Sequence, residues 1–383
     1  MDFIRDSIRR YATIAFSQLQ LIPGGNSILG ISNNFYIFAS IFHGLRLWRV
    51  TLIAYQAVVH MFEQLGFVRR WCISSNNLFR FVLTVRRNYR ANAYHNWSHG
   101  FCVAHFAFLC FVNSQATLHN YLNDLEWLAL FVGALCHDID HPGSTNSYQI
   151  ISNSDMAAVY GDDGPILEQH HVRHTMRILS SPQCDILAGL SKSETDQEKQ
   201  LIQKVILATD LVEHLRIYPK IKKMCDSGFC PSDDKHPHLL LSLLATASDL
   251  SDQCKSCKNT RIATTLIYDE FFQQGDRERA MGMVPALSMD REKAFIPDLQ
   301  IHFMDRIVVP CFGALTSLLP KCEPVFDAVQ RNCRVWRKLI RAIRSDEIES
   351  FSTDRLLKGH YDDLMEQYEK QETNEAHRPA HND

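Results

Sequence analysis

The sequence predicts an all-α fold, because apolar residues recur at helical spacing along most of the chain and the alternation typical of β-strands is nearly absent. Of the 383 residues, 46% are hydrophobic, which is enough for the core of one large domain or of two ordinary ones. No internal repeat is visible. We therefore expect a compact multi-helix bundle.

Three long runs carry this expectation. Residues 123–138 begin with a capping residue, Asn123 or Asp124, and place leucine and valine side chains at helical spacing. Residues 201–225 and 238–255 repeat the pattern. We expect all three runs to be helical.

Other stretches are expected to be irregular. Residues 181–200 and 225–238 have the composition of connections between helices. Residues 275–297 are charged, contain methionines and two prolines, and are a candidate mobile lid over a site. The polar tail from about residue 371 is expected to be disordered.

The N-terminal segment differs in composition from the rest. Residues 11–45 contain no Asp, Glu, Lys or Arg, but serine, asparagine and histidine interrupt the clean run of about 20 apolar residues that a membrane span needs. We expect residues 1–55 to be a helical lead-in of unknown role. It could dock a partner or pair two copies of the chain as a homodimer.

Charge and cysteine content narrow the classes of function. The formal net charge is −3, so no overall positive field attracts nucleic acid or an anionic membrane. The 12 cysteines lack the spacing of a disulfide framework, which favours reduced thiols and a cytoplasmic protein. The lone pair Cys254 and Cys257 is weak support for zinc.

Polar side chains gather at four places near expected helix ends. The sequences are YHNWSHG (94–100), HDIDH (137–141), LEQHH (167–171) with ATD (208–210), and ASDLSDQ (247–253). In the first, His95 and His99 are four residues apart and would share one face if the segment is helical. Each cluster alone has an ordinary explanation as a capped or solvated helix end.

Together the clusters supply imidazoles, a carboxylate beside one of them, and a second carboxylate far along the chain. A mixed nitrogen and oxygen set suits a zinc-like ion, and carboxylate with water suits magnesium or manganese. Helical bundles build such sites from inward-facing residues of several helices. The sequence therefore predicts a binuclear metal site.

Seven motifs occur in order along the chain. They are YHNWSH, CHDIDHPG, LEQHH, LATDL, ASDLSDQ, EFFQQGDRERAMG and LQIHFMD. In order and spacing they resemble the signature series of class I 3′,5′-cyclic nucleotide phosphodiesterases, and several stretches most resemble the dual-specificity, cGMP-stimulated subfamily. The resemblance implies a bundle of the HD-domain phosphodiesterase type with its metal site in a deep pocket. It also implies a catalytic domain over residues 56–350, followed by a C-terminal helix and tail over residues 351–383.

The resemblance assigns metal ligands. A first ion, zinc in the family, would be held by His99, His137, Asp138 and Asp249. Asp138 would bridge to a second ion, Mg²⁺ or Mn²⁺, whose other ligands are mainly waters. A hydroxide between two cations about 4 Å apart would attack the phosphorus in line.

The resemblance also assigns residues around the ions. His141, Glu168 and Thr209 would hydrogen-bond the waters of the second ion. His95 would be the general acid that protonates the leaving O3′, because an imidazolium can deliver a proton near neutral pH.

A purine pocket is expected on the other side of the site. Gln300 would hydrogen-bond the base edge, Phe303 would stack on one face of the base, and Ile267 would press on the other. Tyr94 is a further candidate for substrate contact. Asp252 stands where cAMP-selective relatives commonly have asparagine, which argues against simple cAMP selectivity.

The expected function is metal-dependent hydrolysis of cAMP and cGMP to the 5′-nucleoside monophosphates, which ends cyclic nucleotide signalling. Two alternatives stay open: another HD-class nucleotide phosphohydrolase, and a cyclic-nucleotide binding protein without turnover. The second is disfavoured because the acid and the ligand carboxylates are all present. About 55 residues cannot encode the tandem regulatory domains of the cGMP-stimulated subfamily, so either the chain is a catalytic fragment or its regulation differs. Allosteric activation by cGMP is therefore not carried over from the subfamily.

Overall fold

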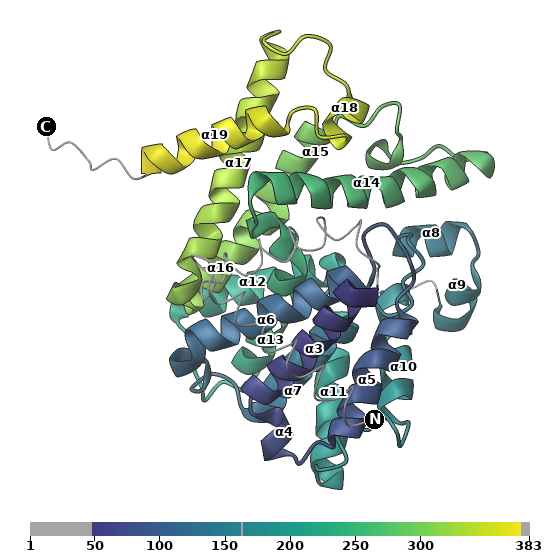
Figure 1. Ribbon diagram of the computed structural model, residues 1–383, viewed down its shortest axis with the longest axis vertical. Helices are drawn as coiled ribbons and strands as arrows, with labels where there is room; N and C mark the ends of the chain where they lie inside the picture. The colour runs from purple at the N-terminus through teal and green to yellow at the C-terminus, as the bar shows by residue number, and fades with distance from the viewer. Residues whose placement is uncertain (1–47, 162–163, 377–383) are drawn as a thin grey trace, which may run out of the picture. The chain divides into compact units, whose positions relative to one another are not determined.

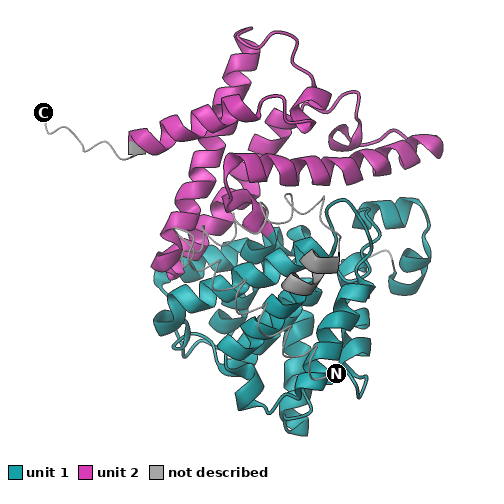
Figure 2. Cartoon of the chain, in the orientation of Figure 1, with its two compact units in different colours: residues 1–249 teal, residues 250–383 magenta. Residues whose placement is uncertain are grey.

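The computed structural model describes residues 48–161 and 164–376, with side chains from residue 55 onward. All regular secondary structure in these ranges is helical, which confirms the all-α prediction (Figure 1). The chain divides into two compact units, residues 1–249 and residues 250–383 (Figure 2). Most of the predicted lead-in, with the charge-free segment 11–45, lies outside the described residues.

The described helices of the first unit are α3 (Trp48–Gln64), α4 (Phe67–Arg70), α5 (Ser75–Asn88), α6 (Trp97–Leu118), α7 (Asp124–Cys136), α8 (Asn146–Ile151), α9 (Asp155–Tyr160), α10 (Ile166–Leu179), α11 (Lys192–Leu207), α12 (Leu211–Ser227) and α13 (Lys235–Asp249).

Helix α7 lies at the centre of the first unit. It starts as predicted, because the side chain of Asn123 accepts from the backbone N–H of Glu126 and the carboxylate of Glu126 accepts from that of Asn123. From Glu126 to its end every residue is buried. It packs against α6, α11 and α13, and a methyl group on Gly133 would lie 2.5 Å from Val205 of α11. The lack of a side chain at residue 133 therefore lets α7 and α11 approach closely.

The run 201–225 is helical but interrupted. Helix α11 ends at Leu207, and the carboxylate of Asp210 caps α12 by accepting from the N–H of Val212. Helix α11 also begins earlier than expected, because Ser191 and Glu194 form a capping box. The prediction that all of residues 181–200 form a connection is therefore wrong.

The described elements of the second unit are the 3₁₀ turns η2 (Leu250–Cys254), η3 (Leu287–Met289) and η5 (Pro320–Cys322), the π-helical turn η4 (Met304–Val308), and the helices α14 (Cys257–Ala280), α15 (Ile296–Phe303), α16 (Val309–Leu318), α17 (Glu323–Arg344), α18 (Thr353–Leu357) and α19 (Asp362–Ala376).

Helix α17 organises the second unit. Its buried Asn332 donates to the backbone carbonyls of Gln253 and Lys255, and so holds the turn η2. Helix α19 packs on α17, where the carboxylate of Glu372 pairs with Arg334 and Lys338. The polar sequence after residue 371 therefore continues as helix to residue 376, contrary to the expected disorder, because its acidic face meets basic side chains.

Two further expectations change in detail. The run 238–255 is α-helical only to Asp249 and continues as the 3₁₀ turn η2. Of the candidate lid 275–297, residues up to 280 belong to α14 and those from 296 belong to α15. The stretch between them is irregular except for η3.

Two helical segments, Trp97–Leu118 and Ile296–Leu318, are long and apolar enough to cross a membrane by length and composition alone. In the first, 72% of the most apolar window is buried inside the protein, as is typical of a core helix.

Helix α11 contains an unusual buried acid, Glu198. The residue has 0% exposure, and neither carboxyl oxygen has a hydrogen-bond partner among the described residues. Burial without a partner disfavours the charged form and raises the pKa of Glu198 from 4.5 to about 9. The neutral acid is therefore the form that the fold accommodates near pH 7.

We expect Glu198→Gln to remove a specific pH dependence of stability. Because the folded pKa lies above the unfolded one, the stabilising contribution of the protonated carboxyl is present below pH 4.5 and is lost as the pH rises toward about 9. Urea unfolding at several pH values should give a variant whose stability falls less over this range than that of the wild type. Asp196→Asn, on an exposed position of the same helix, is the control and should leave the slope unchanged.

Candidate metal centre

The centre is built from the ends of helices. Residue His99 lies in the first turn of α6, whose N-terminus is capped by the side chain of Asn96. His137 is the C-terminal capping residue of α7, and Asp138 follows it. Asp249 is the last residue of α13. His95 lies before the start of α6, so the condition under which it would share a helical face with His99 is not met.

The four predicted ligands of the first ion lie together. The Nε2 atoms of His99 and His137 are 3.2 Å apart. Asp249 Oδ1 lies 2.9 Å from Nε2 of His99 and 3.3 Å from Nε2 of His137. Asp138 Oδ2 lies 3.5 Å and 3.1 Å from the same two nitrogens. Ligands about 2.1 Å from a tetrahedral zinc ion are about 3.4 Å from one another, so these separations fit the edges of one coordination sphere.

Hydrogen bonding alone does not satisfy these atoms. The Nδ1–H of His137 donates to the carbonyl of Ala134 at 2.9 Å, so in the neutral ring Nε2 carries a lone pair. Asp138 Oδ2 is buried and forms no hydrogen bond of acceptable geometry with any described residue. Buried lone pairs that face one another need a proton or a cation between them. The residues therefore fit a metal ion.

The electrostatics agree with this reading. Burial disfavours a charge on His137, but the carboxylates of Asp138 and Asp249 raise its pKa well above the ordinary value. Burial opposes ionisation of Asp138 as well, but the neighbouring histidines, His137 first, hold its pKa well below the usual range. The carboxylates of Asp138 and Asp249 therefore stabilise positive charge between them.

Asp138 is shared with a second group. Three potential ligand atoms, from Asp138, His141 and His171, lie within 4.8 Å of one another. Oδ2 of Asp138 faces the first group, and Oδ1 lies 3.7 Å from His171 Nε2. One carboxylate thus lies between two clusters of potential ligands, as a bridging ligand must.

His141 and His171 present opposite hydrogen-bonding groups. His141 Nδ1 accepts from the N–H of Gly143, and burial holds the pKa of His141 well below its usual value, so its proton is on Nε2. His171 Nδ1 donates to the carbonyl of Ile139 at 2.6 Å, which leaves a lone pair on Nε2. A water between the two rings can accept a hydrogen bond from Nε2–H of His141 and donate one to Nε2 of His171. His171 belongs to the quoted motif LEQHH, but the sequence reading gave it no role.

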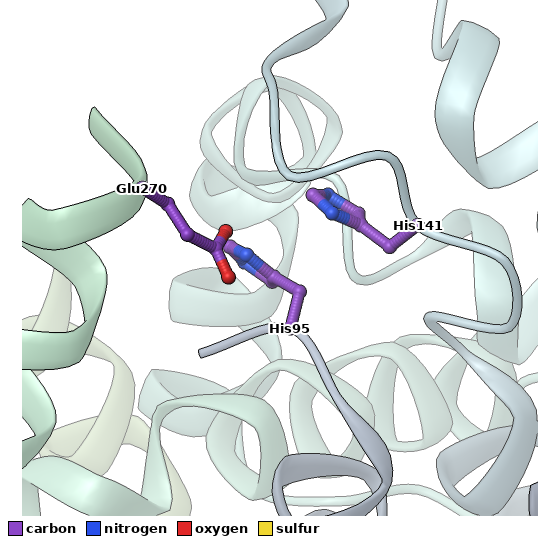
Figure 3. A group of neighbouring side chains, drawn as sticks. All are labelled: His95, His141 and Glu270. Atoms are coloured by element: carbon purple, nitrogen blue, oxygen red, sulfur yellow. The ribbon is translucent and has the colours of Figure 1, made fainter. Parts of the chain in front are cut away.

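His95 is held against His141. The two rings are stacked with centroids 4.0 Å apart and an interplanar angle of 22° (Figure 3). The amide of Asn92 donates to both backbone carbonyls, that of His95 at 2.9 Å and that of His141 at 2.7 Å. Asn92 therefore joins the segment before α6 to the turn after α7. Nothing in its sequence context indicated this role.

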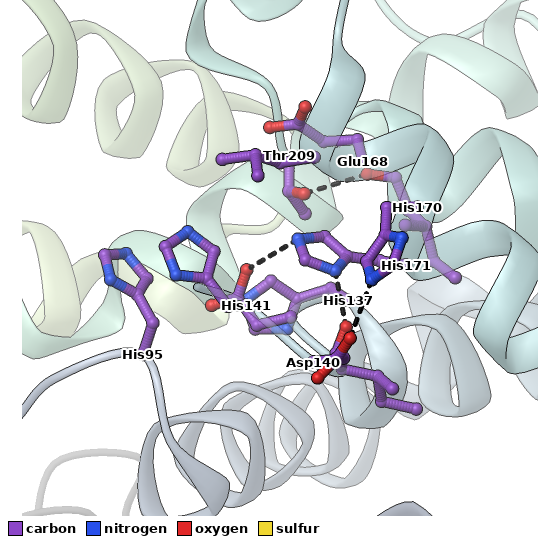
Figure 4. A network of polar contacts seen from close by, with 12 residues as sticks. His95, His137, Asp140, His141, Glu168, His170, His171 and Thr209 are labelled. Atoms are coloured by element: carbon purple, nitrogen blue, oxygen red, sulfur yellow. Dashed lines mark hydrogen bonds and ion pairs between the residues drawn. The ribbon is translucent and has the colours of Figure 1, made fainter. Parts of the chain in front are cut away.

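Glu168 and Thr209 lie near the same centre (Figure 4). Glu168 is in the first turn of α10 and accepts from Asn146 Nδ2 at 2.9 Å. Burial raises its pKa to about 7, so at neutral pH it can both accept and donate. Thr209 Oγ1 donates to the carbonyl of Ile206 at 2.8 Å, which leaves its oxygen lone pairs as acceptors.

The predicted base-binding residues lie in the second unit, except Tyr94. Gln300 of α15 is buried, its Nε2 donates to Gln253 Oε1 at 2.6 Å, and its Oε1 accepts from Thr264 Oγ1 at 3.5 Å. Phe303 ends the same helix, and Ile267 lies on α14. Gln253 was missed, although it lies in the quoted motif ASDLSDQ.

Two candidates for substrate contact have protein partners. Asp252 is 1% exposed and its carboxylate accepts from Lys255 Nζ at 2.5 Å. In the first unit, the ring of Tyr94 lies 4.5 Å from that of His99 and 4.9 Å from that of His95. The substrate contacts of both residues stay predictions.

Comparisons with known proteins agree with the motif series. The sequence profile of the family described as 3′5′-cyclic nucleotide phosphodiesterase matches residues 94–329, which include every predicted site residue. The chain is 34% identical over 308 residues to a "Probable 3′,5′-cyclic phosphodiesterase pde-5" of Caenorhabditis elegans, covering 80% of this chain and 41% of the relative. It is 36% identical over 295 residues to a "Dual 3′,5′-cyclic-AMP and -GMP phosphodiesterase 11A" of Takifugu rubripes, covering 76% and 32%. The chain thus spans less than half the length of these relatives.

We expect Asn92→Ala to destabilise the first unit by about 1–3 kcal/mol, because two backbone carbonyls lose their donor. Asn120→Ala is the control, since that amide donates only to a carbonyl of its own exposed helix end. Equal free energies of unfolding in urea for both variants would contradict the joining role of Asn92.

Removal of bound metal should lower the melting temperature. An ion present at about 100 times its Kd stabilises the folded state by about 2.7 kcal/mol, and a chelator removes that contribution. Asp249→Asn should lose less melting temperature on chelation than the wild type, because a charged ligand of the first ion is lost. The control Asp226→Asn changes a surface ion pair with Lys222 and should respond as the wild type does.

Proposed function

The chain belongs to the 3′5′-cyclic nucleotide phosphodiesterase family, and on that basis we propose that it hydrolyses cAMP and cGMP to the 5′-nucleoside monophosphates. The observation that carries the proposal is the convergence of two imidazole nitrogens and two carboxylate oxygens from α6, α7 and α13. A cation held there would explain how a chain with net charge −3 binds a phosphate anion.

The first ion, a zinc-like cation, would be held by His99, His137, Asp138 and Asp249. A second ion, Mg²⁺ or Mn²⁺, would also be held by Asp138. Its waters would be hydrogen-bonded by His141, Glu168, Thr209 and, in addition, His171. When bound, the two cations would lower the pKa of a water and neutralise charge on the phosphate. The opposite hydrogen-bonding groups of His141 and His171 would orient that water for attack on phosphorus.

His95 would donate the proton that the ribose O3′ needs when it leaves. Its position is supported by stacking on His141 and by the amide of Asn92, which holds its backbone. An acid fixed in this way is oriented before substrate binds, which lowers the cost of positioning it.

Gln300 would bind the purine edge, between Phe303 and Ile267. Its amide has two partners, Gln253 and Thr264, and each of these can exchange donor and acceptor roles. Rotation of the Gln300 amide by half a turn can therefore be matched by rotation of its partners. This supports acceptance of both adenine and guanine, whose edges carry opposite patterns.

Steady-state kinetics on cAMP and cGMP, with Mg²⁺ or Mn²⁺ supplied, test the proposal. We expect both to be hydrolysed, with loss of activity after chelation and recovery when metal returns. A panel of linear nucleotide phosphates is the comparison. Hydrolysis of that panel with no cyclic nucleotide turnover would instead indicate another HD-class phosphohydrolase.

We expect His95→Ala to lower kcat by about 100- to 10,000-fold on both cyclic nucleotides, because loss of general acid catalysis has this cost. Bound metal per chain should stay at the wild-type value, since His95 is not among the proposed ligands. His119→Ala, on the exposed end of α6, is the control. Wild-type turnover in His95→Ala would refute the acid role.

A further inference from the structure

A third cluster of potential ligands lies beside the metal centre and is not used by it. Asp140, in the turn after α7, and His170 and His174, on α10, place one ligand atom each within 4.8 Å of one another. None of the three has a role in the proposed hydrolysis. All three are partly exposed, with side-chain exposures of 26%, 12% and 27%, so an ion can reach them from solvent.

The geometry brings both imidazoles to one oxygen. Asp140 Oδ2 lies 2.8 Å from His170 Nε2 and 3.8 Å from His174 Nε2. The two histidines are four residues apart on α10, so they share a face, and their ring centroids are 4.4 Å apart. Ligands of a tetrahedral zinc ion are about 3.4 Å apart, and the two distances lie on either side of this value.

The backbone and the outer partners hold this arrangement. Asp140 has a φ of 62°, a left-handed conformation that few residues other than glycine adopt, and its N–H donates to the carbonyl of Asn88 at 2.8 Å. On the far side of His170, Nδ1 lies 3.2 Å from the hydroxyl of Tyr160 (Figure 4 shows His170 reaching Asp140). An outer hydrogen bond of this kind fixes the orientation of a metal-binding histidine.

An ion-pair network explains only part of the cluster. Arg90 donates from Nε and Nη2 to the two oxygens of Asp140 at 2.6 and 3.0 Å, and His170 occupies Oδ2 as well. His174 faces the same oxygen at a distance too long for a hydrogen bond. Burial and the nearby His170 lower the pKa of His174, so at neutral pH its imidazole is uncharged and can bind a metal.

We propose that Asp140, His170 and His174 form a separate binding site for a zinc-like divalent cation. Two imidazoles and one carboxylate with an open fourth position suit Zn²⁺ or Co²⁺ and do not suit Ca²⁺ or Mg²⁺, which prefer oxygen ligands. The ion links α10 to the turn that carries Asp138 and His141. Arg90 keeps its bond to the other oxygen of Asp140, and its positive charge weakens the site.

Equilibrium dialysis of the full chain against Zn²⁺, followed by elemental analysis, tests the proposal without any nucleotide. The wild type should bind one zinc ion more per chain than His174→Ala, and the control His119→Ala should bind as many as the wild type. If His174→Ala fails to fold, His174→Gln takes its place. Equal zinc content in the wild type and the His174 variant would overturn the proposal. It would also be overturned if His119→Ala lost as much zinc as the His174 variant, because that result would indicate adventitious surface binding.

Two further variants test the surroundings of the site by competition with a chromophoric chelator. Tyr160→Phe should weaken the additional ion by about 10- to 100-fold, because the outer partner of His170 is lost. Arg90→Gln should tighten it, because a positive charge leaves. Unchanged affinity in both variants would overturn the assignment. Because these measurements count ions and not turnover, they are independent of the proposed hydrolysis.

Discussion

Imidazole nitrogens and carboxylate oxygens that can bind one cation face one another at the C-terminal end of α7, and α6, α7 and α13 hold them there. The Nδ1 atom of His137 is occupied by a backbone carbonyl, so in the neutral ring its Nε2 lone pair faces the carboxylates of Asp138 and Asp249. Bringing such groups out of water is costly unless a cation joins them. The buried helix α7, close against α11 at Gly133, fixes the position of that end.

The turn after α7 carries three side chains that contact the groups around the metal centre. Asp138 lies between two groups of ligands, Asp140 faces two histidines of α10, and His141 carries the stacked ring of His95. Asn92 ties the backbone of this turn to the segment before α6. This turn thus carries the bridging carboxylate and part of the proposed additional cation site, and it contacts the segment that carries the acid.

The sequence predicted the helical fold and the grouping of His99 with Asp249, which are 150 residues apart, because ordered motifs carried both. It did not predict the break between α11 and α12. Asp210 acts as a capping residue because the chain turns there, and the sequence alone did not indicate that turn. Asn92 and Gln253 were missed for a related reason. Each has a contact with a residue far along the chain, Asn92 with His141 and Gln253 with Gln300, and an Asn or Gln has no spacing pattern that reveals such a contact.

Anomalous diffraction at the zinc absorption edge, from crystals of the zinc-loaded chain, tests the central claim most directly. The account predicts a peak about 2.0–2.2 Å from one atom of each of four residues, His99, His137, Asp138 and Asp249. Zinc-loaded crystals with no peak among these four side chains would contradict it.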